Sequence, residues 1–222
     1  MIVAKQKPLE EIREMIDGYE RILVLGCGTC VAICFAGGDR EVGILASSLR
    51  IADKISGGNR VFNEYTVKRQ CEWEFLDEVE DKIAEADVIL SLGCGIGVQA
   101  LAERFPTTPI LPGLNTSFLG MPEEQGIFSE RCAACGNCIL DLTGGICPIA
   151  RCAKSLLNGP GGGSQNGRCE ISTDTPCAWQ LIIDRLTALG QLEKLEEIAP
   201  PKDWSTSSAG GPRRIVREDL VE

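Results

Sequence analysis

Hydrophobic and polar positions alternate along residues 20–113 in a way that is typical of short strands joined by helices. The clearest apolar runs are RILVLGC (21–27) and DVILSLGC (87–94), and each is followed by a helical pattern. Between them lie a weaker strand at 59–71 and a helix at 71–86. This alternation predicts an α/β fold in which a parallel sheet has helices on both faces.

The pattern changes on either side of this region. Residues 1–18 predict an amphipathic helix, with Leu9, Ile12 and Met15 on one face. The last clear helical period starts at Cys177, and the Pro-, Gly- and Ser-rich end of the chain has no period, so we expect it to be extended and either disordered by itself or docked on a partner. The predicted parts are an α/β domain (1–113), a cysteine-rich metal-binding module (114–176), a C-terminal helix (177–196) and an extended tail (197–222).

Composition narrows the possible functions. The 222 residues carry a formal net charge of −10, which argues against nucleic acid and anionic membranes as partners. The most apolar uncharged run, residues 22–38, is too short for a membrane span and is broken by Gly-Cys-Gly. The N-terminus has no apolar leader pattern, so we expect a cytoplasmic protein with reduced thiols.

Twelve cysteines and no histidine define the candidate chemistry. Without histidine there is no Ser-His or Cys-His nucleophile pair, and a metal site must use thiolates. Carboxylates are scattered on helix faces without visible convergence, so acid–base catalysis by this chain is not indicated. We expect a non-catalytic subunit, with no catalytic residues of its own.

Several cysteines follow the predicted strands. Because the carboxyl ends of parallel strands meet at one edge of a sheet, they should lie close together and could hold a 4Fe-4S cluster. The predicted ligands are Cys27, Cys30, Cys71 and Cys94, with Cys34 as an alternative ligand or a buried packing residue. The neighbouring glycines would allow tight turns and close approach to a cluster. Dinucleotide binding at residues 26–28 is the competing interpretation, but a third glycine is missing where Val31 stands.

A second group lies in ERCAACGNCILDLTGGICP (130–148). Cys132, Cys135 and Cys138 follow the C-x2-C-x2-C spacing that favours an iron–sulfur cluster, and Cys147 precedes a proline as in bacterial ferredoxins. A four-thiolate zinc site is the structural alternative. The remaining metal candidates, whose site could hold a third cluster or zinc, are Cys152, Cys169 and Cys177.

Four stretches carry a resemblance: GCGTCVAICFAGG (26–38), SLGCGIGVQALAE (91–103), TGGICPIARCAKSLLNGPGGGSQNGRCE (143–170) and CAWQLIIDRL (177–186). Together they resemble the methylenetetrahydrofolate reductase C-terminal domain family. The resemblance implies a subunit with two 4Fe-4S clusters, sometimes with zinc, that relays electrons to or from the FMN or FAD of a separate catalytic reductase subunit in one-carbon (reductive acetyl-CoA) metabolism. Further electron-transfer subunits could join that complex. The family pattern often has a cysteine where Gly161 stands; if that cysteine is a ligand beside Cys152, Cys169 and Cys177, the third metal site here is incomplete or differently ligated.

Three functions follow as hypotheses. The first is an iron–sulfur electron-transfer subunit of a methylenetetrahydrofolate reductase complex. The second is a zinc-stabilised docking subunit without a redox role. The third is an enzyme that uses the strand-end pocket by itself, which would require turnover without a partner.

Overall fold

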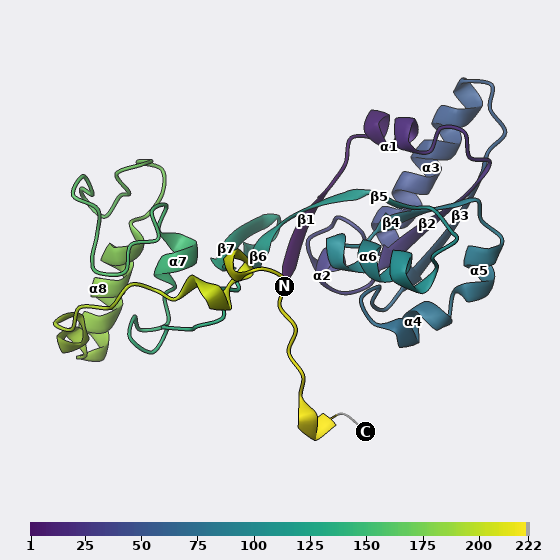
Figure 1. Ribbon diagram of the computed structural model, residues 1–222. Coiled ribbons are helices and arrows are strands. Elements are labelled where there is room, and N and C mark those ends of the chain that lie inside the picture. Colours follow the sequence, from purple (N-terminus) through teal and green to yellow (C-terminus); the bar gives the residue numbers. More distant parts are fainter. Residues whose placement is uncertain (221–222) are drawn as a thin grey trace. The chain divides into compact units, whose positions relative to one another are not determined.

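The computed structural model describes residues 1–220, which divide after residue 129 into two compact units. The first unit contains a parallel sheet and a second, antiparallel sheet (Figure 1). The second unit has short helices, turns and extended segments. Within residues 1–220, no helix is long and apolar enough to cross a bilayer.

The parallel sheet has the strand order β3-β2-β4-β5. Its strands are β2 (Arg21–Cys27), β3 (Val61–Val67), β4 (Val88–Leu92) and β5 (Ile110–Pro112). Cys27 pairs with Val67 of β3, and Gly26 pairs with Leu92 of β4. The chain runs outward from β2 to β3 and then returns to β4 on the other side of β2. A topological switch point therefore lies between β2 and β4, where open α/β sheets bind their ligands.

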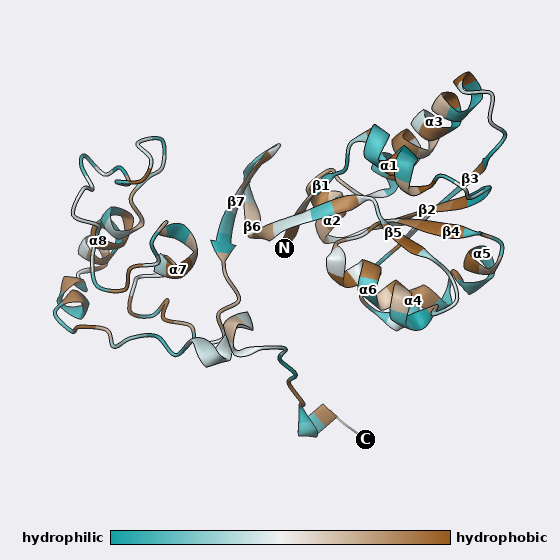
Figure 2. Ribbon diagram, turned by 45° about the horizontal axis from the view of Figure 1, so that its top comes forward, coloured by the Kyte–Doolittle hydropathy of each residue, from teal (hydrophilic) through white to brown (hydrophobic). Residues whose placement is uncertain are grey.

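Helices cover both faces of this sheet, which confirms the α/β prediction (Figures 1 and 2). Ile22 and Val24 of β2 belong to one buried cluster, and Leu23 belongs to the other, because successive strand residues point to opposite faces. The first face is covered by α1 (Leu9–Met15) and α3 (Asp39–Ile55). The second face is covered by α4 (Trp73–Asp77), α5 (Glu80–Ala84) and α6 (Gly95–Arg104).

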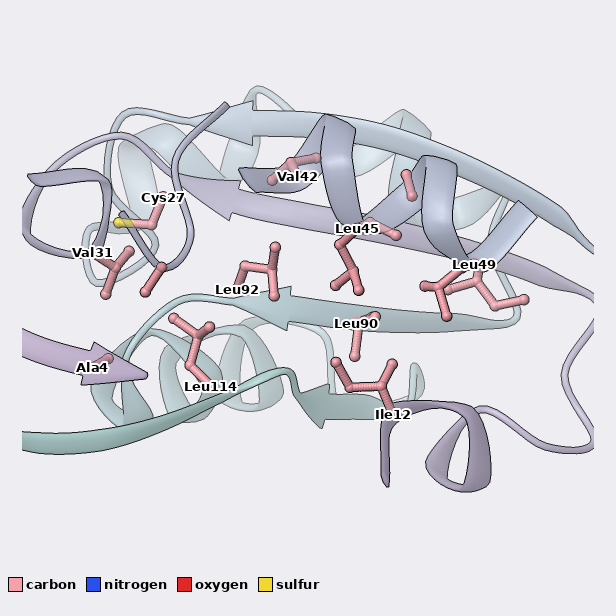
Figure 3. Close-up of a cluster of buried hydrophobic side chains, with 14 of the residues drawn as sticks. Ala4, Ile12, Cys27, Val31, Val42, Leu45, Leu49, Leu90, Leu92 and Leu114 are labelled. Atoms are coloured by element: carbon pink, nitrogen blue, oxygen red, sulfur yellow. The ribbon is translucent and has the colours of Figure 1, made fainter. Parts of the chain in front are cut away.

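The second sheet was not predicted. It has the strand order β1-β6-β7, formed by β1 (Ile2–Gln6), β6 (Leu114–Glu124) and β7 (Ile127–Cys132). The helix expected over residues 1–18 therefore begins only at Leu9, because residues 2–6 pair antiparallel with β6. Ala4 and Leu114 pack at the end of the core that holds Cys27 and Val31 (Figure 3). The sequence-based boundary at residue 113 falls before β6, whereas the structure divides after residue 129.

The helix expected over residues 71–86 is two short helices, α4 and α5. The chain turns between them, where the Val79 N–H donates to the Leu76 carbonyl at 3.2 Å. Leu76, Val79 and Ile83 are buried as expected, but Trp73 is 58% exposed.

The second unit has a small core around α8 (Ala178–Leu189), formed by Cys177, Trp179, Ile182 and Leu186. Trp179 is fixed by its indole N–H, which donates to the Leu156 carbonyl at 2.8 Å. The other short helices of this unit are α7 (Pro148–Arg151), η1 (Leu192–Leu195), η2 (Trp204–Thr206), η3 (Ser208–Gly210) and η4 (Glu218–Leu220).

Candidate functional site

The strand-end cysteines come from separate segments around the switch point. Cys27 ends β2, Cys94 caps the N-terminus of α6, and Cys71 lies in the loop after β3. Burial raises the pKa of the Cys71 thiol, and the nearby thiols of Cys27 and Cys94 raise it further. These three sulfur atoms are therefore electrostatic neighbours.

The fourth predicted ligand, Cys30, is the first residue of α2 (Cys30–Ile33). The pKa of the Arg69 guanidinium is raised mainly by its hydrogen bond to Glu72, with smaller contributions from Cys71 and Cys30. The Arg69 guanidinium is thus close to the Cys71 and Cys30 thiols.

Gln70, which the sequence analysis missed, holds the loop that carries Cys71. Its side chain is 1% exposed, and its amide donates to the carbonyls of Leu25 at 2.8 Å and Gly26 at 3.1 Å. It also accepts a 2.6 Å hydrogen bond from the Ser91 hydroxyl. One side chain therefore ties the Cys71 loop to both β2 and β4. Nothing in the local sequence distinguishes this glutamine from an exposed one.

Two of the four glycines that flank Cys27 and Cys94 are required by the packing of the protein itself. A Cβ at Gly26 would lie 2.6 Å from both Thr66 and Val42, and a Cβ at Gly93 would lie 2.1 Å from Gln70. At these two positions protein atoms fill the space, so close packing of the chain accounts for the glycines, not the approach of a cluster.

Cys34 differs from the predicted ligands in its environment, because it packs inside the hydrophobic core. It is 8% exposed and belongs to the buried cluster, with its Sγ atom 3.6 Å from the Ala4 carbonyl and 3.5 Å from the Val31 carbonyl. Burial raises the pKa of its thiol. This is the environment of a packing cysteine, the alternative to a ligand role.

The C-x2-C-x2-C segment follows β7 on the surface of the second unit. Cys132 and Cys138 are exposed, and Cys135 is partly buried. The Ala134 N–H donates to the Cys132 sulfur at 3.3 Å, and the Cys135 thiol lies 3.6 Å from the Asn137 carbonyl. The first of these, an N–H donated to sulfur, is the kind of hydrogen bond that orients a thiolate ligand and adjusts the potential of a bound cluster, whereas the second requires a protonated thiol. Cys147, partly buried, caps α7.

The tail, expected to be disordered or docked on a partner, contacts this cysteine loop. The Thr206 hydroxyl donates to the Cys135 carbonyl at 2.8 Å, and Arg213 donates to the Ala134 carbonyl at the same distance. Lys202 donates to the Asn137 carbonyl at 3.0 Å. The tail therefore brings two cations to the backbone of the loop that carries the three thiols.

We expect Gly136→Ala to release the tail. A Cβ there would lie 2.1 Å from the Thr206 carbonyl oxygen, whereas at Gly126, which shares the φ of +82°, nothing lies within 4 Å. Both alanine variants bear the same backbone strain, so only Gly136→Ala should speed trypsin cleavage after Lys202 or Arg213. Loss of about 1 kcal/mol of local stability gives a roughly fivefold faster rate. Equal cleavage rates in the two variants would contradict the contact.

The last three cysteines line one small cavity in the second unit, together with Glu170, Gly161 and Ser164. Burial opposes ionisation of Cys177, but hydrogen bonds from the Ser164 hydroxyl and the N–H groups at the start of α8 lower its pKa overall. The pKa of Lys154 is raised by its hydrogen bond to Glu170 and further by Cys169 and Cys152. Three thiols, a carboxylate and a cation are thus neighbours here.

The three sets of cysteines described above offer sulfur ligands, which suit metals that bind thiolates. All twelve cysteines are free. Among residues 1–220, however, no three or more Cys, Asp or Glu side chains are arranged as they stand to hold a metal ion. Binding would require the thiols of each group to close on the metal. Glu170 and Lys154 were not predicted, although Glu170 directly follows a candidate cysteine.

Residues 111–205 match a family model described as methylene-tetrahydrofolate reductase C terminal. The match contains the seven cysteines from Cys132 to Cys177, while the five strand-end cysteines precede it. Comparisons with curated proteins and with solved structures give no match. Residues 111–205, less than half of the chain, are therefore similar to the methylene-tetrahydrofolate reductase C-terminal family, in agreement with the resemblance seen in the sequence.

Proposed function

We propose that this chain is an iron–sulfur electron-transfer subunit that associates with a flavin-containing methylenetetrahydrofolate reductase. The observation that carries the proposal is that Cys27 ends β2, Cys94 follows β4 and Cys71 follows β3, close enough for the Cys27 and Cys94 thiols to raise the pKa of Cys71, with Cys30 in the next helix. A single surface cysteine can have many roles. Cysteines from several segments at the ligand-binding edge of a parallel sheet favour an iron–sulfur cluster site. The family of residues 111–205 supports the identity of the partner.

A 4Fe-4S cluster, when bound, would supply one-electron transfer. The chain's own contribution would be to hold it. Cys27, Cys30, Cys71 and Cys94 would ligate one cluster, and Cys132, Cys135 and Cys138, with Cys147, a second. Gln70 would keep Cys71 in place relative to β2 and β4. Because the chain has no histidine, we assign the folate chemistry to the partner's flavin.

Metal content tests this proposal. The full chain, purified without oxygen, is expected to contain about eight iron and about eight sulfide per chain, with visible absorbance that bleaches on reduction. Cys71→Ser should lose about half of the iron, since one of two clusters would lack a ligand. Cys34→Ala is the matched control and should keep all of it, because Cys34 packs in the core.

Two results would contradict the proposal. An iron-free, colourless preparation would favour the zinc-stabilised docking subunit. Equal iron in Cys71→Ser and the unmodified chain would remove the strand-end site. Electron transfer itself is tested by mixing the reduced chain with the flavin-containing subunit, whose flavin absorbance should bleach. If the flavin stays oxidised, the chain holds clusters but does not relay electrons to that partner.

A further inference from the structure

Helix α3 is apolar on the side that faces away from the parallel sheet as well as on the side that packs against it (Figure 2). Val42 and Leu45 are buried on the inner side. On the outer side, Ile44, Ile51 and Ile55 are 56%, 60% and 82% exposed. Their spacing of seven and then four residues places them on one face of the helix. The outer face of a surface helix is normally polar, so this row of isoleucines indicates an interaction surface.

A hollow lies at the first turn of α3. Phe35, Arg40 and Ile44 line it on one side, and the turn between β6 and β7 lines it on the other. Phe35 has a φ of +55°, which is uncommon for an aromatic residue, and its side chain is half exposed. All of these residues belong to the first unit. The two apolar side chains, Phe35 and Ile44, make the hollow suited to an aliphatic side chain.

The other end of the same helix carries a side chain that fits this description. Ile55 is the last residue of α3 and the most exposed of its three outer isoleucines. In an antiparallel pair of α3 helices with a two-fold axis between Ser47 and Ser48, residues equally distant from the axis face each other. This pairing places Ile44 of one copy opposite Ile51 of the other. It also brings Ile55 of each copy to the first turn of the other α3, where the hollow lies.

The centre of this pairing is suited to close packing. Ser47 and Ser48 have small side chains, which allow two helices to approach each other closely. The Ser48 hydroxyl already donates to the Ile44 carbonyl at 2.9 Å, so its burial would leave no donor unpaired.

The charges at the two ends of α3 favour the antiparallel direction. Asp39 and Glu41 outnumber Arg40 in the first turn, and Lys54 is the basic residue of the last turn. Antiparallel packing brings these opposite charges together and opposes the two helix dipoles. Parallel packing would place Lys54 beside its own copy. Because the exposed isoleucine and the hollow lie on one helix, the surface is complementary to itself, as a two-fold interface requires.

We propose that two copies of this chain form a dimer by antiparallel packing of their α3 helices. Ile55 of each copy would enter the hollow beside Phe35 and Ile44 of the other. The inference goes beyond the proposed function, since it involves neither a metal nor the reductase, and it can fail or succeed separately from that function.

Sedimentation of the full chain over a range of concentrations tests the dimer. The unmodified chain is expected to sediment with twice the mass of one chain and to dissociate on dilution. Ile51→Glu should raise the dissociation constant by about 30-fold or more, because it places two buried charges near the two-fold axis. Ile96→Glu is the matched control, since Ile96 is a 57% exposed isoleucine of another helix, α6, and should leave dimerisation unchanged.

Both variants should unfold in urea like the unmodified chain, because both isoleucines are exposed. An unmodified chain that is monomeric at every concentration would overturn the proposal. Equal dissociation constants for the two variants would also overturn it.

Photocrosslinking tests the direction of packing without disturbing the centre of the interface. With a benzophenone side chain in place of Ile55, light should produce a species of twice the mass. Mass spectrometry should then locate the crosslink at residues 35–44 of the other copy. Crosslinks to residues around position 55 would show parallel packing and overturn the proposal. Crosslinks that form only when the reductase subunit is added would also overturn it, by assigning this face to a different protein.

Discussion

Gly37→Ala is expected to lower the free energy of unfolding by about 3 kcal/mol or more. A Cβ at Gly37 would lie 1.9 Å from the carbonyl oxygen of Leu92, which is backbone at the end of β4 and cannot rotate away. The Gly37 carbonyl accepts the Cys27 N–H at 2.9 Å, and the Gly37 N–H donates to the Val31 carbonyl at 3.1 Å. The glycine therefore lies between the ends of β2 and β4, where a methyl group would push the strands apart.

Gly43→Ala is the matched control for this prediction. Gly43 lies inside α3, and a Cβ there would meet only Glu64, at 3.7 Å. Alanine should therefore stabilise the protein by about 0.5–1 kcal/mol through helix propensity. Urea unfolding of the three proteins measures both effects. If the two alanine variants had the same stability, the close approach of Gly37 to β4 would be wrong.

Gln70→Ala is expected to cost about 2–4 kcal/mol of stability, because it removes three hydrogen bonds from a buried site and leaves their partners without replacement. The affected groups are the carbonyls of Leu25 and Gly26 and the hydroxyl of Ser91. The substitution should also loosen the loop of Cys71, so that its thiol reacts faster with an alkylating reagent in metal-free protein.

Gln99→Ala provides the comparison. The exposed Gln99 amide donates to the Gly95 carbonyl at 2.9 Å within α6, and its loss should change stability by less than about 0.5 kcal/mol. Chemical unfolding gives the stabilities, and mass spectrometry after timed alkylation gives the reactivity of Cys71. A Gln70→Ala protein that unfolds like Gln99→Ala would show that the buried hydrogen bonds do not hold the loop.

The positions of Cys27 and Cys94 were predictable from the sequence, because they depend on where the parallel strands end. The apolar runs that end near Cys27 and Cys94 predict strands, and parallel strands bring their carboxyl ends to one edge whatever their separation in sequence. Positions that depend on one side chain were not predictable. Cys34 differs from Cys30 by its burial against Ala4, which belongs to a strand that the sequence analysis expected to be helical.

The sequence by itself determined the parallel sheet, the helices on its two faces and the restriction of metal chemistry to thiols and carboxylates, because periodicity and composition are properties of short segments. The tertiary structure alone decided the antiparallel sheet, the burial of Gln70 and the position of the Glu170 carboxylate beside Gly161. Each of these depends on which distant segments pair or pack together, and β1 and β6 are separated by more than 100 residues. Local patterns carry no information about such partners.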